Sequence, residues 1–195
     1  MEEKFDVLNE RGEFTGEVAT RKECHEKGLW HRAVYAFIVD KDFNVLLQKR
    51  SANKKLWPNK WDVTIGGHVN AGEFGRQALI RECKEELGIE INDDEIKYLV
   101  STTSVYDKNN YINNHYDECY LITRSVNIED LKLQKEEVSY AKYFPMEEVI
   151  ERINNNYDGL TEKTGSWAIF KRIVESNVLE QISNKQYIKT KKYKR

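Results

Sequence analysis

Three kinds of feature are scarce in this chain of 195 residues: cysteines, long apolar runs and an excess of charge of either sign. The three cysteines, Cys24, Cys83 and Cys119, are odd in number and widely spaced. The sequence therefore predicts neither a disulfide framework nor a cysteine-based zinc site, and we expect reduced thiols.

Charge is nearly balanced, and no apolar run approaches the length of a membrane-spanning helix. The 31 basic and 33 acidic residues give a net charge of −2, which predicts no general attraction to nucleic acid or to a membrane surface. The first residues, MEEKFDVLNERGE, are too acidic and polar for a signal peptide, so a cytoplasmic location is expected. An anionic substrate would have to be captured by a local site.

The pattern of apolar and polar residues predicts a single α/β domain over residues 1–184, with a small N-terminal β-hairpin extension at residues 1–28 and a basic tail at residues 185–195. Polar stretches such as residues 107–114 are expected to separate the strands. Strands are predicted at residues 5–9, 17–20, 31–40, 44–50, 61–67, 96–106, 114–124 and 138–144. Helices are predicted at residues 146–153 and, from the helical spacing of apolar residues up to Val178 and Ile182, at residues 166–182.

The most informative segment is GHVNAGEFGRQALIRECKEELGI, residues 67–89. At about 100° per residue, Glu82, Glu85 and Glu86 form an acidic fan along one edge of a helix, with Arg81 on the other side. Carboxylates this close repel one another unless a cation lies among them, and Mg²⁺ or Mn²⁺ is expected because hard cations prefer oxygen ligands. Beside the fan lies an apolar face that carries Leu79, Ile80, Cys83 and Leu87.

This segment resembles the box of the Nudix hydrolases, which reads Gly, five residues, Glu, seven residues, Arg-Glu, an aliphatic, any residue, Glu-Glu, any residue, Gly and an aliphatic. Cys83 takes the first aliphatic position as a small hydrophobe. The other fixed positions are matched by Gly67, Glu73, Arg81, Glu82, Glu85, Glu86, Gly88 and Ile89. The resemblance implies the Nudix α/β/α sandwich with a mixed sheet.

The resemblance also implies how the box would act on a diphosphate. Its metal ligands would be the backbone carbonyl of Gly67 and the carboxylates of Glu82, Glu85 and Glu86. The general base would be a box glutamate, Glu82 or Glu85, or a glutamate from a later loop, for which Glu137 is the candidate. The sequence leaves this choice open.

Other residues would support the site or contact the substrate. By resemblance, Arg81 pairs with Glu73 as a scaffold. A cationic pair at a strand end can neutralise a phosphate, and an aromatic side chain can stack on a base, although each is also common as ordinary surface or packing. These substrate-binding candidates are Lys49, Arg50, Trp57 and His68.

A second resemblance covers roughly the first half of the chain, where LNERGEFTG and LLQKRSANKKLWPNKWDVTIGGH look like type I isopentenyl-diphosphate isomerase, itself a Nudix-fold enzyme. That isomerase needs a cysteine just before the Gly-His pair, and here Gly66 stands in its place. Positions that bind a metal in the isomerase are matched approximately by His25, His31 and His68. Whether these histidines form a second metal site is open.

The sequence therefore predicts a hydrolase, dependent on Mg²⁺ or Mn²⁺, that cleaves the diphosphate of a nucleoside diphosphate linked to a further group X. Isomerase activity is the alternative, and a non-catalytic ligand-binding Nudix domain is a third reading. The expected partner is a small-molecule diphosphate, with no membrane or nucleic acid. The sequence leaves open the group X, the number of metal ions and whether the chain forms a homodimer.

Overall fold

The structure, a computed structural model, describes residues 2–108, 110–162 and 164–176. Its α-helices are Arg21–Lys27 (α1), Gly75–Leu87 (α2), Met146–Asn154 (α3) and Thr164–Glu175 (α4), and two short 3₁₀ helices span Asp93–Glu95 and Ile128–Asp130. Its strands are Lys4–Leu8 (β1), Phe14–Thr20 (β2), His31–Val39 (β3), Asn44–Arg50 (β4), Trp61–Asp62 (β5), Ile65–His68 (β6), Ile96–Lys108 (β7), Tyr111–Thr123 (β8) and Val138–Pro145 (β9).

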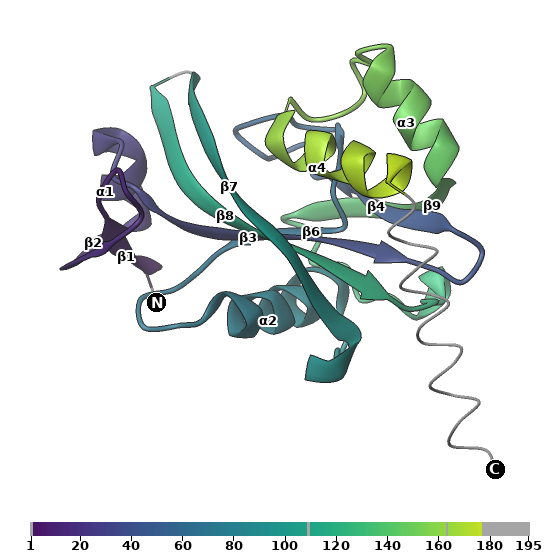
Figure 1. Cartoon of the computed structure of the whole chain (residues 1–195), viewed down its shortest axis with the longest axis horizontal. Helices are drawn as coiled ribbons and strands as arrows, with labels where there is room; N and C mark the ends of the chain where they lie inside the picture. Colours follow the sequence, from purple (N-terminus) through teal and green to yellow (C-terminus); the bar gives the residue numbers. More distant parts are fainter. Residues whose placement is uncertain (1, 109, 163, 177–195) are drawn as a thin grey trace.

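A mixed sheet forms the centre of the molecule. Its strands follow the order β5-β4-β3-β8-β7, while β6 also pairs with β3 and β9 with β4. The pairing of β3 with β8 is parallel and the pairing of β7 with β8 is antiparallel. Figure 1 shows α2 on one face of this sheet and α3 and α4 on the other. The predicted α/β class, with helices on both faces of a mixed sheet, is confirmed.

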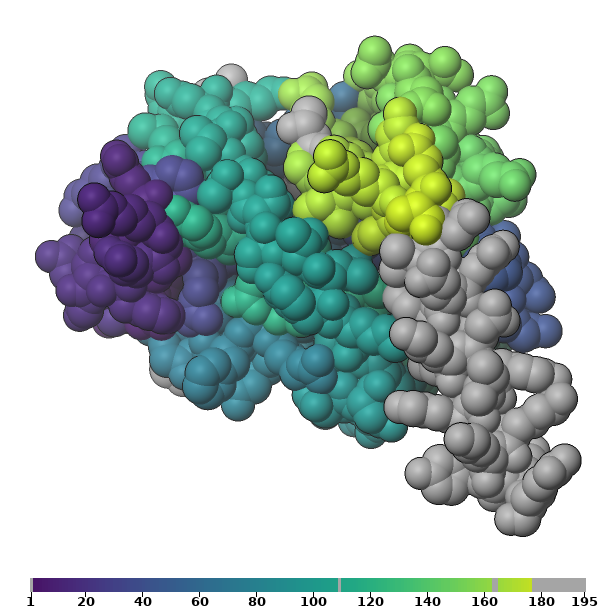
Figure 2. Space-filling view, viewed as in Figure 1, coloured from purple at the N-terminus to yellow at the C-terminus, as the bar shows by residue number. Residues whose placement is uncertain are grey.

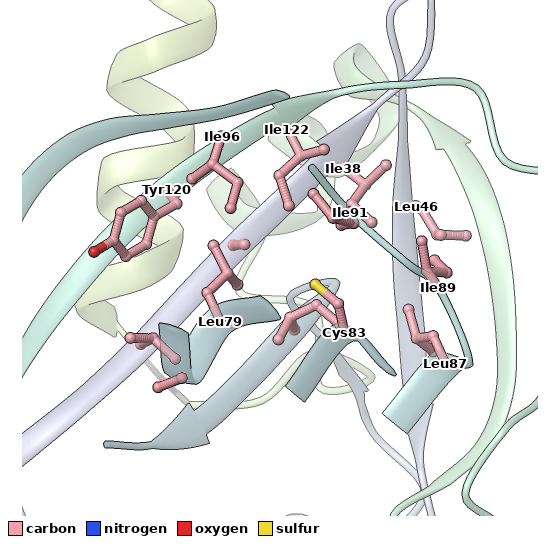
Figure 3. Close-up of a cluster of buried hydrophobic side chains, with 14 of the residues drawn as sticks. Ile38, Leu46, Leu79, Cys83, Leu87, Ile89, Ile91, Ile96, Tyr120 and Ile122 are labelled. Atoms are coloured by element: carbon pink, nitrogen blue, oxygen red, sulfur yellow. The ribbon is translucent and has the colours of Figure 1, made fainter. Parts of the chain in front are cut away.

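Strand β3 explains why the sheet needs helices on both sides. Ala33, Tyr35 and Phe37 belong to the core that α3 and α4 cover, and the alternate residues Val34 and Ala36 belong to the core above α2. A strand buried on both faces reads as a continuous apolar run instead of an alternating one. Figure 3 shows the α2 core, where Leu79, Cys83 and Leu87 point toward Ile38, Ile96 and Ile122.

The N-terminal residues form a separate small unit against one end of the sheet. β1 and β2 pair as the predicted antiparallel hairpin. The structure adds α1, which the sequence reading missed, although Thr20 and Glu23 form a capping box of the S/T-x-x-E type. Figure 2 shows this unit, in purple, beside the teal surface of the β7–β8 region. Contacts from β8 to the unit include a hydrogen bond of 2.6 Å from the Tyr116 hydroxyl to the backbone carbonyl of Glu10.

Two predicted strand boundaries were wrong. The segment 61–67 is not one strand, because β5 pairs with β4 whereas β6 pairs with β3. Thr64 lies between these two short strands, and its side-chain oxygen accepts a hydrogen bond of 2.9 Å from the backbone nitrogen of Ile38. The polar residues at 107–114 do not separate strands cleanly either, since β7 runs through Lys108 and β8 begins at Tyr111. Cross-strand pairing overrides local polarity here.

The helix predicted after Pro145 is present as α3, and the C-terminal helix is present as α4. Val178, Ile182, the proposed domain end at residue 184 and the basic tail 185–195 lie outside the described residues. Within the described part of the chain, no helix is both long enough and apolar enough to cross a membrane.

Candidate active site

Helix α2 places the acidic fan at the edge of the sheet. Its apolar residues Leu79 and Cys83 are fully buried, so the neighbouring carboxylates are drawn inward with them. The side chains of Glu82 and Glu86 are buried, whereas that of Glu85 is about half exposed. Gly88 ends the helix in the left-handed region at φ 70°, where a residue with a Cβ is strained. The fan therefore has two sheltered members and one that faces solvent.

Arg81 contacts the fan directly, which corrects the expectation that it lies on the other side of the helix. Its Nη1 donates to Glu82 Oε1 at 2.7 Å and to Glu85 Oε2 at 3.1 Å. Its Nε and Nη2 donate to the two oxygens of Glu73 at 3.1 and 3.0 Å, so the pairing with Glu73 is also present. Nη2 further donates to the backbone carbonyl of His68 at 2.9 Å. A long guanidinium reaches residues one turn away, which a helical wheel does not represent.

Gly67 forms a close contact with the fan. A Cβ built at this position would lie 2.2 Å from the carboxyl carbon of Glu82, closer than any side chain allows. The absence of a side chain therefore lets the Glu82 carboxylate approach the backbone of β6. A carbonyl oxygen and carboxylates gathered in this way are the donor set that Mg²⁺ or Mn²⁺ takes, so the residues fit such an ion.

Glu86 has a polar neighbour that the sequence reading did not single out. Gln48 on β4 donates through Nε2 to Glu86 Oε2 at 3.2 Å, while the buried Oε1 of the same amide has no hydrogen-bond partner in the part of the chain that the structure describes. Gln48 is 3 % exposed. This hydrogen bond from β4 helps to hold the Glu86 carboxylate in place.

Burial affects the protonation of the fan. It raises the pKa of Glu82 to about 7, and Arg81 opposes this shift by stabilising the ionised carboxylate. Glu85 also raises this pKa, as a like charge nearby would. A divalent cation among these oxygens would favour the charged form of Glu82, so cation binding and proton release are coupled.

Glu82→Gln should change how the stability of the metal-free protein depends on pH. Because the folded pKa of Glu82 is raised from 4.5 to about 7, this carboxyl stabilises the fold fully below about pH 4.5, and the contribution is lost as pH rises through about 7. The glutamine variant lacks this titration. Its melting temperature, measured in EDTA, should therefore rise relative to wild type between about pH 5 and pH 8. Melting temperatures that keep a constant difference across this range would contradict the assignment.

The fan borders a cavity of about 1080 Å³. Glu82, Glu85 and Glu86 line one part of it, and Lys54 and Lys55, which the sequence reading did not select, line another. An anionic substrate in this cavity would meet ammonium groups as well as the carboxylates and any cation that they hold. The cavity therefore provides the local site for an anionic substrate that the sequence predicts, since the net charge is nearly balanced.

The predicted cationic pair at the end of β4 is split by the strand geometry. Successive strand side chains point to opposite faces, and Arg50 lines the cavity whereas Lys49 does not. Arg50 donates to Asp62 Oδ2 at 3.0 Å and to the carbonyl of Leu56 at 3.1 and 3.2 Å. Its guanidinium thus ties the loop after β4 to β5.

Two further predicted residues line the same cavity. Trp57 is 6 % exposed and meets the ring of Tyr106 edge to face, with centroids 5.2 Å apart. Glu137 forms an ion pair with Lys54, so the candidate base from the later loop already has a cationic partner. Lys54 follows β4 and Glu137 precedes β9, and these two strands pair with each other. Long-range strand pairing brings the two residues together, and no local pattern signals it.

The histidines of the isomerase-like segment converge beside the box. His25 on α1, His31 on β3 and His68 on β6 meet His115 on β8, which the sequence reading did not identify as a candidate. Burial lowers the pKa of His25 and of His31 to about 4, and it lowers the pKa of His68 as well. Phe5 of β1 stacks on His31 and His68 with centroid separations of 5.0 and 4.8 Å. The register of β3 with β8 pairs His31 with His115.

Comparisons with known proteins agree with this geometry. A family model described as NUDIX domain matches residues 29–163. Nudix hydrolase 3 of Arabidopsis thaliana is 40% identical over 152 residues, which is 75% of this chain but only 20% of that much longer protein. An uncharacterized Nudix hydrolase of Listeria monocytogenes is 36% identical over 147 residues, 75% of this chain and 82% of the relative.

Two further matches bear on the fold and on the isomerase resemblance. A crystal structure of a protein from Deinococcus radiodurans has a TM-score of 0.68 at 25% identity and covers 87% of this chain and 98% of that protein. An isopentenyl-diphosphate Delta-isomerase of Salmonella arizonae is 30% identical over 124 residues, which is 64% of this chain and 66% of the isomerase. Both resemblances seen in the sequence therefore have counterparts among known proteins.

Proposed function

The chain belongs to the NUDIX domain family, a family of hydrolases, and we propose that it is an active diphosphate hydrolase. Its proposed substrate is a nucleoside diphosphate linked to a further group X, and its proposed cofactor is Mg²⁺ or Mn²⁺. The observation that carries the proposal is the complete set of box carboxylates on the wall of a large cavity that also holds lysines. A Nudix domain that only bound a ligand would not need all of these carboxylates.

In the proposed reaction, Glu82, Glu85, Glu86 and the carbonyl of Gly67 would hold the cation. When bound, the cation supplies Lewis-acid activation of the phosphate and of the attacking water. Arg81 keeps the carboxylates of Glu82 and Glu85 oriented through its hydrogen bonds to both. These residues would thus form a fixed frame for the cation, whose charge would offset that of the diphosphate.

The chemical step breaks one phosphorus–oxygen bond of the diphosphate and forms another to water. A carboxylate accepts the proton of the attacking water, and the leaving phosphate departs with the electron pair of the broken bond. We propose as the base a box glutamate, Glu82 or Glu85, or Glu137 of the later loop, because all three line the cavity. Lys54 and Lys55 would offset charge on the part of the substrate that the cation does not reach.

Trp57 would contact the organic part of the substrate. It lines the cavity next to Tyr106, and its ring also has the ammonium of Lys108 5.7 Å from its centroid. An aromatic and cationic wall of this kind suits a nucleobase or another flat group. We also propose a cytoplasmic setting, because Cys24, Cys83 and Cys119 are all unpaired and buried.

Isomerase activity remains the second candidate, favoured by the similarity to the Salmonella isomerase and by the histidines next to the box. Gly66 argues against it. A glycine has no side chain to deliver or remove a proton at the allylic carbon, and its neighbour Gly67 has none either. Proton transfer on a carbon skeleton would require a group that this position lacks.

A substrate panel separates these candidates. Nucleotide sugars, dinucleoside polyphosphates, oxidised nucleotides and isopentenyl diphosphate should each be incubated with Mg²⁺ and with Mn²⁺, in parallel with a chelator. We expect cleavage of at least one nucleoside diphosphate derivative into two phosphate products, with loss of cleavage in chelator. In deuterated water, isopentenyl diphosphate should gain no deuterium and form no dimethylallyl isomer. Efficient isomerisation without cleavage of any diphosphate would instead assign the chain to the isomerases.

A further inference from the structure

All four histidines of the chain meet in one cluster, although they come from four different elements. His25, His31, His68 and His115 each offer a ring nitrogen, and these nitrogens all lie within 4.8 Å of one another. Three of the four residues are buried and His68 is partly buried. Surface histidines placed by chance would not converge in this way.

Backbone carbonyls fix two of the rings so that one nitrogen faces the cluster. His25 Nδ1 lies 3.0 Å from the carbonyl of Ile112, and His31 Nδ1 lies 2.8 Å from the carbonyl of Leu29. A carbonyl only accepts, so Nδ1 must carry the proton in both rings, and Nε2 keeps its lone pair. In metal-binding histidines, the ring nitrogen that does not bind the metal usually donates a hydrogen bond of this kind.

Three of the inward-facing nitrogens have no hydrogen-bond partner among the described residues. They are Nε2 of His25, of His31 and of His68, and all three are buried. A buried polar atom without a hydrogen-bond partner destabilises a fold, so three such atoms facing one space indicate that a ligand binds there. Stacking of Phe5 on two of the rings supplies apolar contact but satisfies none of these nitrogens.

We propose that His25, His31, His68 and His115 bind one Zn²⁺ ion, separate from the cation of the box, and that this ion fastens the N-terminal unit to the sheet. The proposal does not depend on the hydrolytic activity. Imidazole nitrogens suit Zn²⁺ and related transition metals, whereas Mg²⁺ prefers oxygen ligands. A set of four protein ligands is typical of a structural zinc site, because a catalytic site keeps one position open.

The geometry needs only a small adjustment. Bonds of about 2.1 Å in a tetrahedral site bring the ligand nitrogens to about 3.4 Å from one another. The nitrogens lie within 4.8 Å, so the rings would tilt inward when the ion binds. A carboxylate lies near His115, whose Nδ1 is 3.7 Å from Asp117 Oδ1.

A metal at this position would add a further link between the N-terminal unit and the sheet. His25 is the ligand from the N-terminal unit, while the other three come from β3, β6 and β8. The unit is also held by the Asn114 side chain, which donates to the Gly28 carbonyl at 2.8 Å. Arg21 and Lys22 of α1 line the cavity, so fixing α1 also fixes one wall of the substrate site.

Cobalt substitution tests the ligand set directly. The full chain, stripped of metal, should bind one Co²⁺ in a site with the intense visible bands of tetrahedral coordination, in addition to weakly absorbing Co²⁺ in the box, and Zn²⁺ should displace the tetrahedral ion. His25→Gln and His68→Gln should lose these bands and bind Zn²⁺ at least about 10²-fold more weakly, because loss of even an outer-shell partner weakens a site about 10–100-fold. Lys22→Gln, an exposed change on the same helix, should keep both properties.

Glu85→Gln is the matched control for the box. Glu85→Gln should keep the tetrahedral Co²⁺ spectrum. Zn²⁺ should slow hydrogen exchange in α1 of Glu85→Gln, as in wild type. Zn²⁺ should not slow this exchange in His25→Gln. Circular dichroism of each variant checks that it is folded, and the wild-type spectrum tests the proposal without any substitution. A wild-type spectrum without tetrahedral bands, tetrahedral bands abolished by Glu85→Gln, or unchanged Zn²⁺ affinity in a folded His25→Gln would each overturn the proposal.

Discussion

Glu85→Gln should lower kcat for diphosphate cleavage by about 10²-fold or more at saturating cation, and Glu82→Gln should have an effect of similar size. Each change removes a negatively charged oxygen donor while keeping the size of the side chain. The apolar face of α2 is untouched, since Leu79, Cys83 and Leu87 do not contribute to the fan. Steady-state kinetics over a range of Mn²⁺ concentrations measures the effect.

The control for this pair is Glu90→Gln. Glu90 lies just beyond the same helix, is exposed, and pairs only at the surface with Lys84 at 3.2 Å. Its neutralisation should leave kcat within about twofold, because exposed ion pairs contribute little. Near-normal turnover of Glu85→Gln at saturating cation would remove Glu85 from the proposed site, and the same result for Glu82→Gln would remove Glu82.

Arg81→Ala should both destabilise the protein and reduce turnover. The substitution leaves Glu73 and Glu82 without the guanidinium that neutralises them, and both side chains are largely buried. Removing one partner of a buried ion pair costs about 3 kcal/mol, which lowers the melting temperature of a domain of this size by about 6–12 °C. Calorimetry in EDTA measures the loss.

The cation should partly compensate for the missing guanidinium, because both neutralise the same carboxylates. The melting temperature of Arg81→Ala should therefore rise more than that of wild type when Mn²⁺ is added. Lys84→Ala, an exposed change on the same helix, controls for loss of a positive charge. If Arg81→Ala melts like wild type in EDTA, Arg81 does not support the site in the way its hydrogen bonds suggest.

Much of the fold could be predicted because local pattern and tertiary structure agree there. The apolar residues of α2 recur at helical spacing, and Gly88 ends the helix with the positive φ that favours glycine. The continuous apolar run of β3 corresponds to a strand buried on both faces. The hairpin of β3 with β4 follows from two such runs joined by a short polar segment.

The remaining features depend on contacts between distant segments. His115 belongs with His25 and His31 only because β8 pairs with β3 in parallel and α1 packs against β8. Lys54 reaches Glu137 through the pairing of β4 with β9. The contacts of Arg81 depend on side-chain reach, which the helical wheel omits. Neither composition nor periodicity contains this information.

The parallel pairing of β3 with β8 also governs the order in which the chain can fold. The N-terminal hairpin and the hairpin of β3 with β4 close over short loops, so they can form early. On its other edge β3 pairs with β8, which is complete only after the ribosome has released the chain beyond Thr123. The whole box lies between β3 and β8 in the sequence. Pairings of such long sequence separation fold slowly, and until then the apolar edge of β3 is open to aggregation. The frame that carries the box is therefore completed late, and until then one edge of β3 has no strand partner.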